Sequence, residues 1–314
     1  AMLNNLRRDA LEKMRESRIA PFKTDRRFIP KACEMPKQEK LLIVQNEDVT
    51  KAKTLLACGA DLFEWQPQVY KPEVLSRMIE GADGVKPVFV LPAVMHSDEL
   101  ERLHAWVCDH AERLSGVVVN NPGQLALSWP APVSGGQGLN VMNHACAEFY
   151  TTLGTNRLTV SCELNQKELR DLFVSGGNYV MEAYGRTQLM LLNHCPHRTE
   201  KGDVRQDNRC DACARRGGCP EIYTDRKGYR FPLRRLQMEH GCVLRLYNSV
   251  ETDMAKYAEK LHQFSVSLRL AFTDESFGKQ QEITASYRSV MDAGTALHSI
   301  SPTSTAGQLL RGVQ

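Results

Sequence analysis

The chain has 314 residues, of which 42% are hydrophobic and 25% are charged, as in ordinary globular proteins. This length suits one large α/β domain or two smaller ones. The net charge of +3 excludes the bulk basic character that would by itself indicate nucleic-acid binding. No apolar run approaches the roughly 20 residues of a membrane span, and no signal-peptide pattern opens the sequence, so we expect a cytoplasmic protein without membrane contact.

The first 38 residues are predicted to form a helix and a linker. Residues 2–18 place apolar side chains at helical spacing, with Arg, Lys and Glu on the other face. Residues 19–38 contain three prolines, which favour an irregular connection. The sequence opens Ala1-Met2 and enters the helical pattern at once, which suggests a segment of a longer protein.

From residue 39, short apolar runs alternate with helix-like segments. The runs are β-branched or aromatic and continuous, which is typical of strands buried on both faces of a parallel sheet. They lie at 41–44, 62–65, 87–92, 116–121, 138–143, 157–164, 179–185 and 189–192. Further on, the pattern predicts strands at 243–249 and 266–272 and helices at 251–264 and 275–293.

So many β/α units favour a TIM-like (β/α) barrel over residues 39–293. An open doubly wound sheet is the alternative. The first strand is not followed by G-x-G-x-x-G, which argues against a dinucleotide-binding fold. Residues 294–314 are rich in Ser, Thr and Gly and are expected to form a partly ordered tail.

Polar residues follow several predicted strands. In a barrel, the carboxyl ends of the strands share one face, where catalytic groups are found. The expected face comprises Glu64, Asn120, Asn121, Asn143, His144, Cys162, Glu163, Glu182, Tyr184, Arg186, His194, Cys195, Asn248 and Arg269. Within it, Glu163 and Glu182 either form a substrate-facing acid pair or make rim ion pairs with Arg186 or Arg226.

Half of the ten cysteines fall between residues 188 and 249. They are Cys195, Cys210, Cys213, Cys219 and Cys242. The Cys210-x-x-Cys213 spacing lets two thiolates reach one ion or cluster, so it favours a metal site over disulfides. Spacing does not separate a structural zinc from an iron–sulfur cluster, since both accept four thiolates. We expect this cysteine loop, residues 193–242, to lie at the barrel rim.

Four segments resemble the collagenase-like peptidase family, a group of peptidases without an assigned mechanism. They are SCELN (161–165), EAYGRTQLMLLNHCP (182–196), TDRKGYRFPL (224–233) and CVLRLYNS (242–249). The resemblance extends over most of residues 39–290. Residues 2–18 also resemble a segment found in the long members, so the chain is similar to the C-terminal half of such a protein. The missing N-terminal half is then an expected partner.

The resemblance implies a TIM-like barrel and a 4Fe–4S cluster, with zinc as the alternative metal. Cys195 and Cys242 match family positions. We expect Cys210 and Cys213 to complete the ligand set, with Cys219 as the alternative ligand. The resemblance also implies an enzyme that hydroxylates RNA bases, in tRNA or rRNA, or a small molecule such as a ubiquinone precursor. The RNA-hydroxylating members use prephenate as hydroxyl source, so prephenate is an expected small-molecule partner.

The candidate catalytic residues are Glu163, Glu182, Tyr184, Arg186 and His194. His194 adjoins the ligand candidate Cys195 and could hydrogen-bond near the cluster. His194 and His197 flank Cys195, so a peptidase with Cys195 as nucleophile and a histidine as its base is an alternative. A cluster ligand, however, cannot also attack a peptide, and neither G-x-S-x-G nor H-E-x-x-H occurs.

A third possibility is a non-catalytic half that binds RNA or another substrate and whose metal only stabilises a loop. Arginines lie beside aromatic residues within the cysteine loop, at Tyr229, Arg230, Phe231, Arg234 and Arg235. Such a run could hold a phosphate backbone and stack a base.

Overall fold

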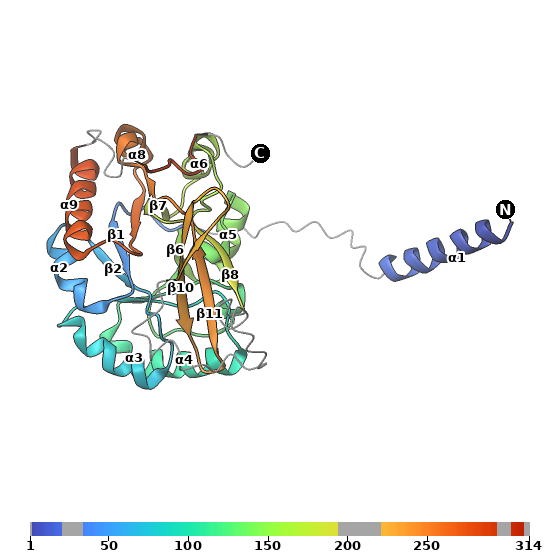
Figure 1. The fold of residues 1–314 in the computed structure, drawn as a ribbon, viewed down its shortest axis with the longest axis horizontal. Helices are drawn as coiled ribbons and strands as arrows, with labels where there is room; N and C mark the ends of the chain where they lie inside the picture. The colour runs from blue at the N-terminus through green and yellow to red at the C-terminus, as the bar shows by residue number, and fades with distance from the viewer. Residues whose placement is uncertain (1, 21–33, 194–220, 294–302, 311–314) are drawn as a thin grey trace. The chain divides into compact units, whose positions relative to one another are not determined.

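The computed structural model describes residues 2–20, 34–193, 221–293 and 303–310. The chain divides into two compact units, Ala1–Ala32 and Cys33–Gln314. The first contains α1 (Met2–Ile19), in agreement with the predicted helix, and none of its residues is buried. The second contains everything that follows (Figure 1).

Eight parallel strands of the described chain close into a barrel. Their order around the barrel is the chain order, with β6 paired to β7 and β13 paired to β1. They are β1 (Leu42–Asn46), β2 (Leu62–Trp65), β3 (Val88–Val90), β4 (Gly116–Val119), β5 (Val133–Gly135), β6 (Thr155–Thr159), β7 (Tyr179–Gly185) and β13 (Ser267–Ala271). The TIM-like barrel is therefore confirmed, and the open-sheet alternative is wrong.

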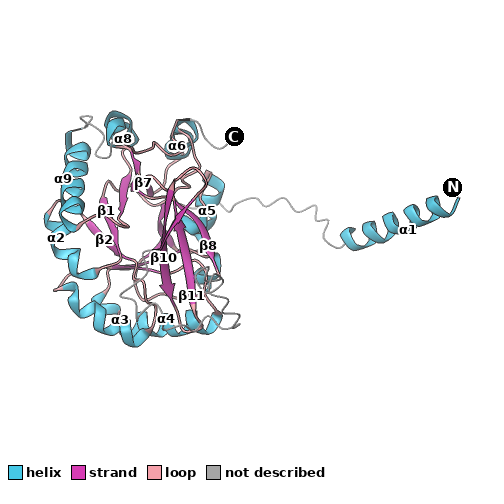
Figure 2. Ribbon diagram, viewed as in Figure 1, coloured by secondary structure: helices cyan, strands magenta, loops and turns pink. Residues whose placement is uncertain are grey.

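Helices lie outside the barrel strands (Figure 2). The α-helices are α2 (Ala52–Ala57), α3 (Pro72–Met78), α4 (Ser97–Asp109), α5 (His144–Thr152), α6 (Gln166–Val174), α8 (Ala258–Phe264) and α9 (Phe277–Ala293). Local capping explains where they begin. At α6, the Asn165 side chain accepts from the backbone N–H of Glu168, whose carboxylate accepts from the Asn165 N–H.

A four-stranded antiparallel sheet, here called the inserted sheet, separates β7 from β13 in the chain. Its order is β8 (Gln188–Leu192), β11 (Cys242–Tyr247), β10 (Arg230–Gln237) and β9 (Glu221–Thr224). The prediction that 189–192 and 243–249 are barrel strands was therefore wrong. In β11, Val243, Leu244 and Arg245 are all buried, and a strand covered on both faces has the same continuous pattern as a barrel strand.

Two other predicted elements differ. Residues 138–143 were expected to form a strand but contribute a short 3₁₀ turn (Gln137–Leu139) and one bridge between Val141 and Val160. The barrel strand at this point is β5, whose Val-Ser-Gly sequence is too short and polar to be recognised. The predicted helix 251–264 begins later, as a 3₁₀ turn (Ala255–Tyr257) that leads into α8 at Ala258, because Thr252–Asp253 forms β12, antiparallel to β7.

The barrel interior differs from one side to the other. Val88, Val90 and Val118 of β3 and β4 form a buried apolar cluster, with Leu62 packed against it. On β1, β2, β7 and β13, the polar side chains Gln45, Glu64, Glu182 and Arg269 are joined by hydrogen bonds or charge. We call these four residues the polar layer, and Glu64 is in register with Val88, so the layer lies beside the apolar cluster.

Candidate functional site

Glu64 on β2 and Arg269 on β13 form an ion pair in the polar layer. Arg269 Nη2 donates to Glu64 Oε1 at 2.9 Å, and Nε lies 2.8 Å from Oε2. Gln45 Nε2 adds a third donor to Oε2 at 3.1 Å. The Arg269 side chain is only 2% exposed and that of Glu64 only 1%. The two charges are therefore shielded from water and depend on each other for compensation.

Glu182 on β7 lies beside this ion pair, in register with Arg269. Its Oε2 accepts from Gln137 Nε2 at 2.6 Å. Desolvation raises the pKa of the Glu182 carboxyl, although the positive charge of Arg269 and the Gln137 hydrogen bond oppose that rise. Glu182 is therefore suited to hold a proton at a pH where an exposed carboxyl has lost it.

Arg245 connects the inserted sheet to the barrel. It is buried on β11, and its Nη2 donates to Glu47 Oε1 at 2.9 Å, just past the end of β1. Its Nη1 donates to Gln66, which follows β2. The guanidinium also lies over the ring of Tyr247 at 5.6 Å. This buried charged contact fixes the inserted sheet over the barrel end.

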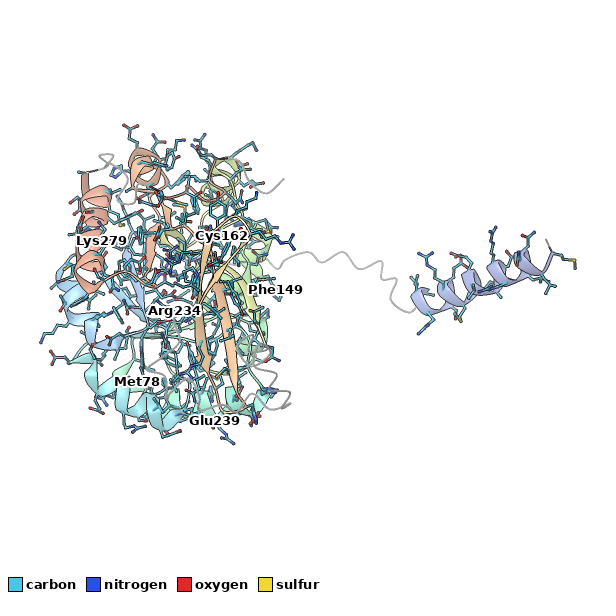
Figure 3. The ribbon with its side chains drawn as sticks, in the orientation of Figure 1. Met78, Phe149, Cys162, Arg234, Glu239 and Lys279 are labelled. Carbon is cyan, nitrogen blue, oxygen red and sulfur yellow. The ribbon has the colours of Figure 1, made fainter. Side chains whose placement is uncertain are left out.

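A cavity of about 250 Å³ lies between the polar layer and the inserted sheet. The segments that line it follow β1, β2, β3, β4, β5, β6, β7 and β13, so it is at the carboxyl ends of the barrel strands. From the inserted sheet come Gln188, Leu191, Leu236, Arg245 and Tyr247. We name this space the polar cavity. Cys162 beside it and Arg234 on β10 are labelled in Figure 3.

Most of the predicted face reaches a cavity wall. Asn120, Cys162, Glu163, Glu182, Arg186 and Arg269 line the polar cavity, and Tyr184 and Asn248 line a neighbouring cavity. Asn121 instead caps a 3₁₀ helix (Pro122–Ala126) and Asn143 caps α5, by accepting from the N–H groups of Gly123 and Cys146. His144 lies 3.4 Å from Glu148 on its own helix.

The contacts of Arg186 are with carboxylates and backbone carbonyls of the loops around the cavity. Arg186 pairs with Glu251 at 2.5 Å and Asp274 at 3.0 Å, and Nη1 donates to the carbonyls of Asn248 and Ser249. With its donors used in this way, Arg186 orders the loops around the cavity. The alternative that Glu163 or Glu182 pairs with Arg186 is not what the structure shows, since Glu251 and Asp274 are its carboxylates.

Tyr184 is buried, with its ring 5.9 Å from that of Phe272. Burial and the neighbouring carboxylates of Glu275, Glu251 and Asp253 raise its pKa, so the hydroxyl stays protonated across the physiological range. Tyr184 can act as a hydrogen-bond donor at the cavity wall.

The cysteine candidates divide between described and undescribed residues. Cys195, Cys210, Cys213 and Cys219, and also His194, lie outside the described residues. Cys242 begins β11, and Leu244, two residues further, pairs with Leu192 at the end of β8, just before the loop leaves the sheet. Within the described residues, no group of three or more His, Cys, Asp or Glu is arranged to hold a metal ion.

Several cavity residues were not anticipated from the sequence. These are Gln45, Asn46, Glu47, Gln66, Gln137, Asn140 and Arg245. Gln45 lies near the end of β1 and Gln66 follows β2. Selecting polar residues at the carboxyl ends of predicted strands, which identified Glu64 and Asn120, could therefore also have identified these two. Arg245 could not be found in that way, because it belongs to the inserted sheet and its partners precede it by almost 200 residues.

The described cavity walls do not combine a reactive thiol with a histidine. No histidine lines either cavity in the described chain. Desolvation by the cavity walls and the negative charges of Glu182 and Glu163 raise the pKa of the Cys162 thiol to about 11, although solvent reaches the side chain. A thiol of that pKa is a poor source of thiolate at neutral pH.

No protein-family model and no curated protein matches the chain. Among solved structures, it is similar to the U32 peptidase Mk0906, with 12% identity, a TM-score of 0.40 and coverage of 81% of this chain and 99% of that one. It is also similar to the Bacillus cereus spore cortex-lytic enzyme SleL, with 9% identity, a TM-score of 0.38 and coverage of 82% and 76%. A chitinase from Chromobacterium violaceum is similar with 10% identity, a TM-score of 0.34 and coverage of 82% of this chain and 100% of that one.

At these identities and TM-scores, the similarities carry no conclusion about family or activity. None of the described helices is long and apolar enough to cross a membrane.

Proposed function

We propose that the chain is an iron–sulfur protein of the collagenase-like peptidase family that acts in hydroxylation of RNA bases or of a related small molecule. Cys195, Cys210, Cys213 and Cys242 are the proposed ligands of a 4Fe–4S cluster, with Cys219 as the alternative ligand. The family and the cluster rest on the sequence motifs, and the proposed location is the cytoplasm.

One structural observation carries the proposal: the strand that begins with Cys242 also forms the wall of the polar cavity. Arg245 and Tyr247 of β11 line the cavity, and Cys242 lies three residues from Arg245. At a rise of about 3.3 Å per residue, that separation is roughly 10 Å. A cluster held at this end of the sheet would therefore be close to a molecule bound in the polar cavity.

The cavity itself favours a polar and uncharged reactant. Gln45, Gln66, Gln137, Asn120 and Asn140 supply amide groups, which can both donate and accept. The arginines of the polar cavity are already paired with carboxylates. This pattern supports recognition of a nucleobase edge more than of a dianion such as prephenate.

The β9–β10 hairpin supplies a surface for the remainder of an RNA. Residues 222–230 are exposed, including Tyr229, which is 54% exposed. Arg226, Lys227 and Arg230 have no ion-pair partner among the described residues. Unpaired cations beside exposed aromatic rings suit a single-stranded phosphate backbone.

The first test is the visible spectrum and metal content of anaerobically purified protein. Broad brown absorption with about four iron and four sulfide per chain supports the proposal. Cys195→Ala or Cys242→Ser should bleach the protein, whereas Cys108→Ser, at an exposed cysteine on α4, should not. Colourless protein with stoichiometric zinc would overturn it.

The peptidase alternative has a separate test. It predicts gelatin cleavage by pure protein that persists after iron is removed. The raised Cys162 pKa and the cavity walls without histidine in the described chain disfavour it. No cleavage by pure protein would end that alternative.

A further inference from the structure

A second cavity of about 380 Å³ adjoins the polar cavity. The two share one wall, to which Ser161, Cys162, Glu163 and Glu182 contribute. The second cavity lies on the other side of these residues, towards β12 and α6. Two spaces that meet at one wall could hold two molecules in contact with the same side chains.

The deep part of the second cavity is apolar. Leu169 of α6, Met181 of β7, Met254 and Leu309 line it, and all four are buried. They come from four separate parts of the chain, so the apolar lining is a product of the fold rather than of one local run. An apolar ring or chain would replace water there at a favourable free energy.

The C-terminal segment 303–310 builds one side of this cavity. Thr305 N donates to the Glu251 carbonyl and Asp253 N to the Thr305 carbonyl, each at 2.9 Å. Gln166 N donates to the Leu309 carbonyl at 2.9 Å, and the Leu309 side chain is only 2% exposed. Thr305, Gly307, Gln308 and Leu309 therefore form a fixed wall.

The charges around the second cavity select against anions. Arg186 is the one cation that lines it in the described chain, and Glu251 and Asp274 already neutralise that guanidinium. Glu163 adds a carboxylate to the wall. An anionic ligand would lose hydration without gaining a free counter-charge.

We propose that the second cavity is a binding site for a small neutral molecule with an apolar ring or chain, held against the wall that it shares with the polar cavity. The inference rests on the proposed function only for its purpose, which is to hold a neutral small molecule as acceptor of the hydroxyl group. The binding itself follows from the cavity lining.

The probe is 4-methylphenol, a neutral ring with one hydroxyl, compared with 4-methylbenzoate, which has the same ring and a negative charge. Ligand-observed NMR on the whole protein should give a Kd on the order of 1 mM for the phenol, as expected for a ligand of this size. Binding of the benzoate should be at least tenfold weaker.

Two variants locate the site. Met254→Trp fills the apolar end, and Gln308→Trp obstructs the cavity from an exposed position, which keeps the test valid if the first variant does not fold. Each should weaken phenol binding at least tenfold. Gln45→Ala, which changes the polar cavity alone, should alter it less than twofold.

Equal binding of the two probes, no phenol binding up to 10 mM, or folded tryptophan variants with an unchanged Kd would overturn the inference. The metal measurements test the proposed function separately from this inference. A colourless protein that binds the phenol defeats the proposed function and leaves this site standing, whereas a brown protein that does not bind it defeats only the inference.

Discussion

Arg269 reaches across the barrel interior to Glu64, with Nη2 donating to Oε1 at 2.9 Å and Nε 2.8 Å from Oε2. This contact joins β13 to β2 although β1 lies between them. It also places a fixed positive charge beside Glu182, whose carboxyl interacts with Arg269. The floor of the polar cavity therefore depends on one buried ion pair.

Breaking that pair on one side should destabilise the fold strongly. In Arg269→Met, the Glu64 carboxylate stays buried without its counter-charge, which typically costs about 3–5 kcal/mol in the free energy of unfolding. Urea unfolding followed by circular dichroism measures the loss. The double variant Glu64→Leu/Arg269→Met should be more stable than Arg269→Met. A single variant that loses less than about 1 kcal/mol would show that the pair is dispensable.

Glu182 should make stability depend on pH. Its pKa is raised above the ordinary value of 4.5, so the folded protein keeps a proton that the unfolded chain releases. The stability that this group contributes is complete below about pH 4.5 and is lost as pH rises through the raised pKa.

The Glu182→Gln variant keeps an amide at this position and has no proton to lose. Its melting temperature should fall less than that of the wild type as pH rises from 5 to 9, and it should be relatively more stable at the alkaline end. Glu163→Gln, on the exposed side of the shared wall, is the matched control. Identical pH profiles for wild type and Glu182→Gln would contradict the assignment.

Cys162 should react slowly with alkylating agents at neutral pH. With a pKa of about 11, the folded thiol is almost fully protonated at pH 7. In urea the same residue returns to a pKa of about 8.5 and should be alkylated by iodoacetamide at least a hundredfold faster. Peptide mapping by mass spectrometry measures both rates. Faster labelling in the folded protein would reveal an activated thiolate and would restore the peptidase alternative.

The sequence predicts the barrel because buried parallel strands have a simple signature. Runs such as LLIV at 41–44 and GVVV within 116–121 are continuous and apolar, and they coincide with β1 and β4. Chain order and parallel pairing then place Asn120, Glu182 and Arg269 at one end of the barrel without knowledge of any contact. This is why much of the candidate site could be located in advance.

The inserted sheet could not be predicted in the same way. Its strand β11 has the burial pattern of a barrel strand. The amino-acid pattern of a six-residue strand does not distinguish parallel from antiparallel pairing when both faces are buried. The contact of Arg245 with Glu47 depends on that pairing, so it was also missed. The short strand β5, which positions Gln137 next to Glu182, is too polar to be distinguished from a loop.

The β9–β10 hairpin provides the most direct test of RNA binding. The sequence directed attention to Arg234 and Arg235, but Arg234 Nη2 donates to the Thr273 carbonyl at 3.0 Å and both arginines are half-buried. Arg230, which belongs to the same predicted run, is exposed, and Arg226 and Lys227 beside it are exposed cations that the prediction did not include. We expect Arg226→Glu/Arg230→Glu to weaken binding of a labelled twelve-nucleotide single-stranded RNA at least tenfold.

The salt dependence of that binding identifies its origin. Each lost phosphate contact should reduce the slope of log K against log salt by about 0.7. Tyr229→Ala should weaken binding without changing the slope, because it removes stacking and no charge. The charge-matched comparison is between the single hairpin variant Arg230→Glu and Lys86→Glu, each of which reverses one charge. Lys86 lies just before β3 and so at the amino end of the barrel strands, and its reversal should leave affinity unchanged. Equal losses in Arg230→Glu and in Lys86→Glu would mean that net charge, rather than the hairpin, attracts the RNA.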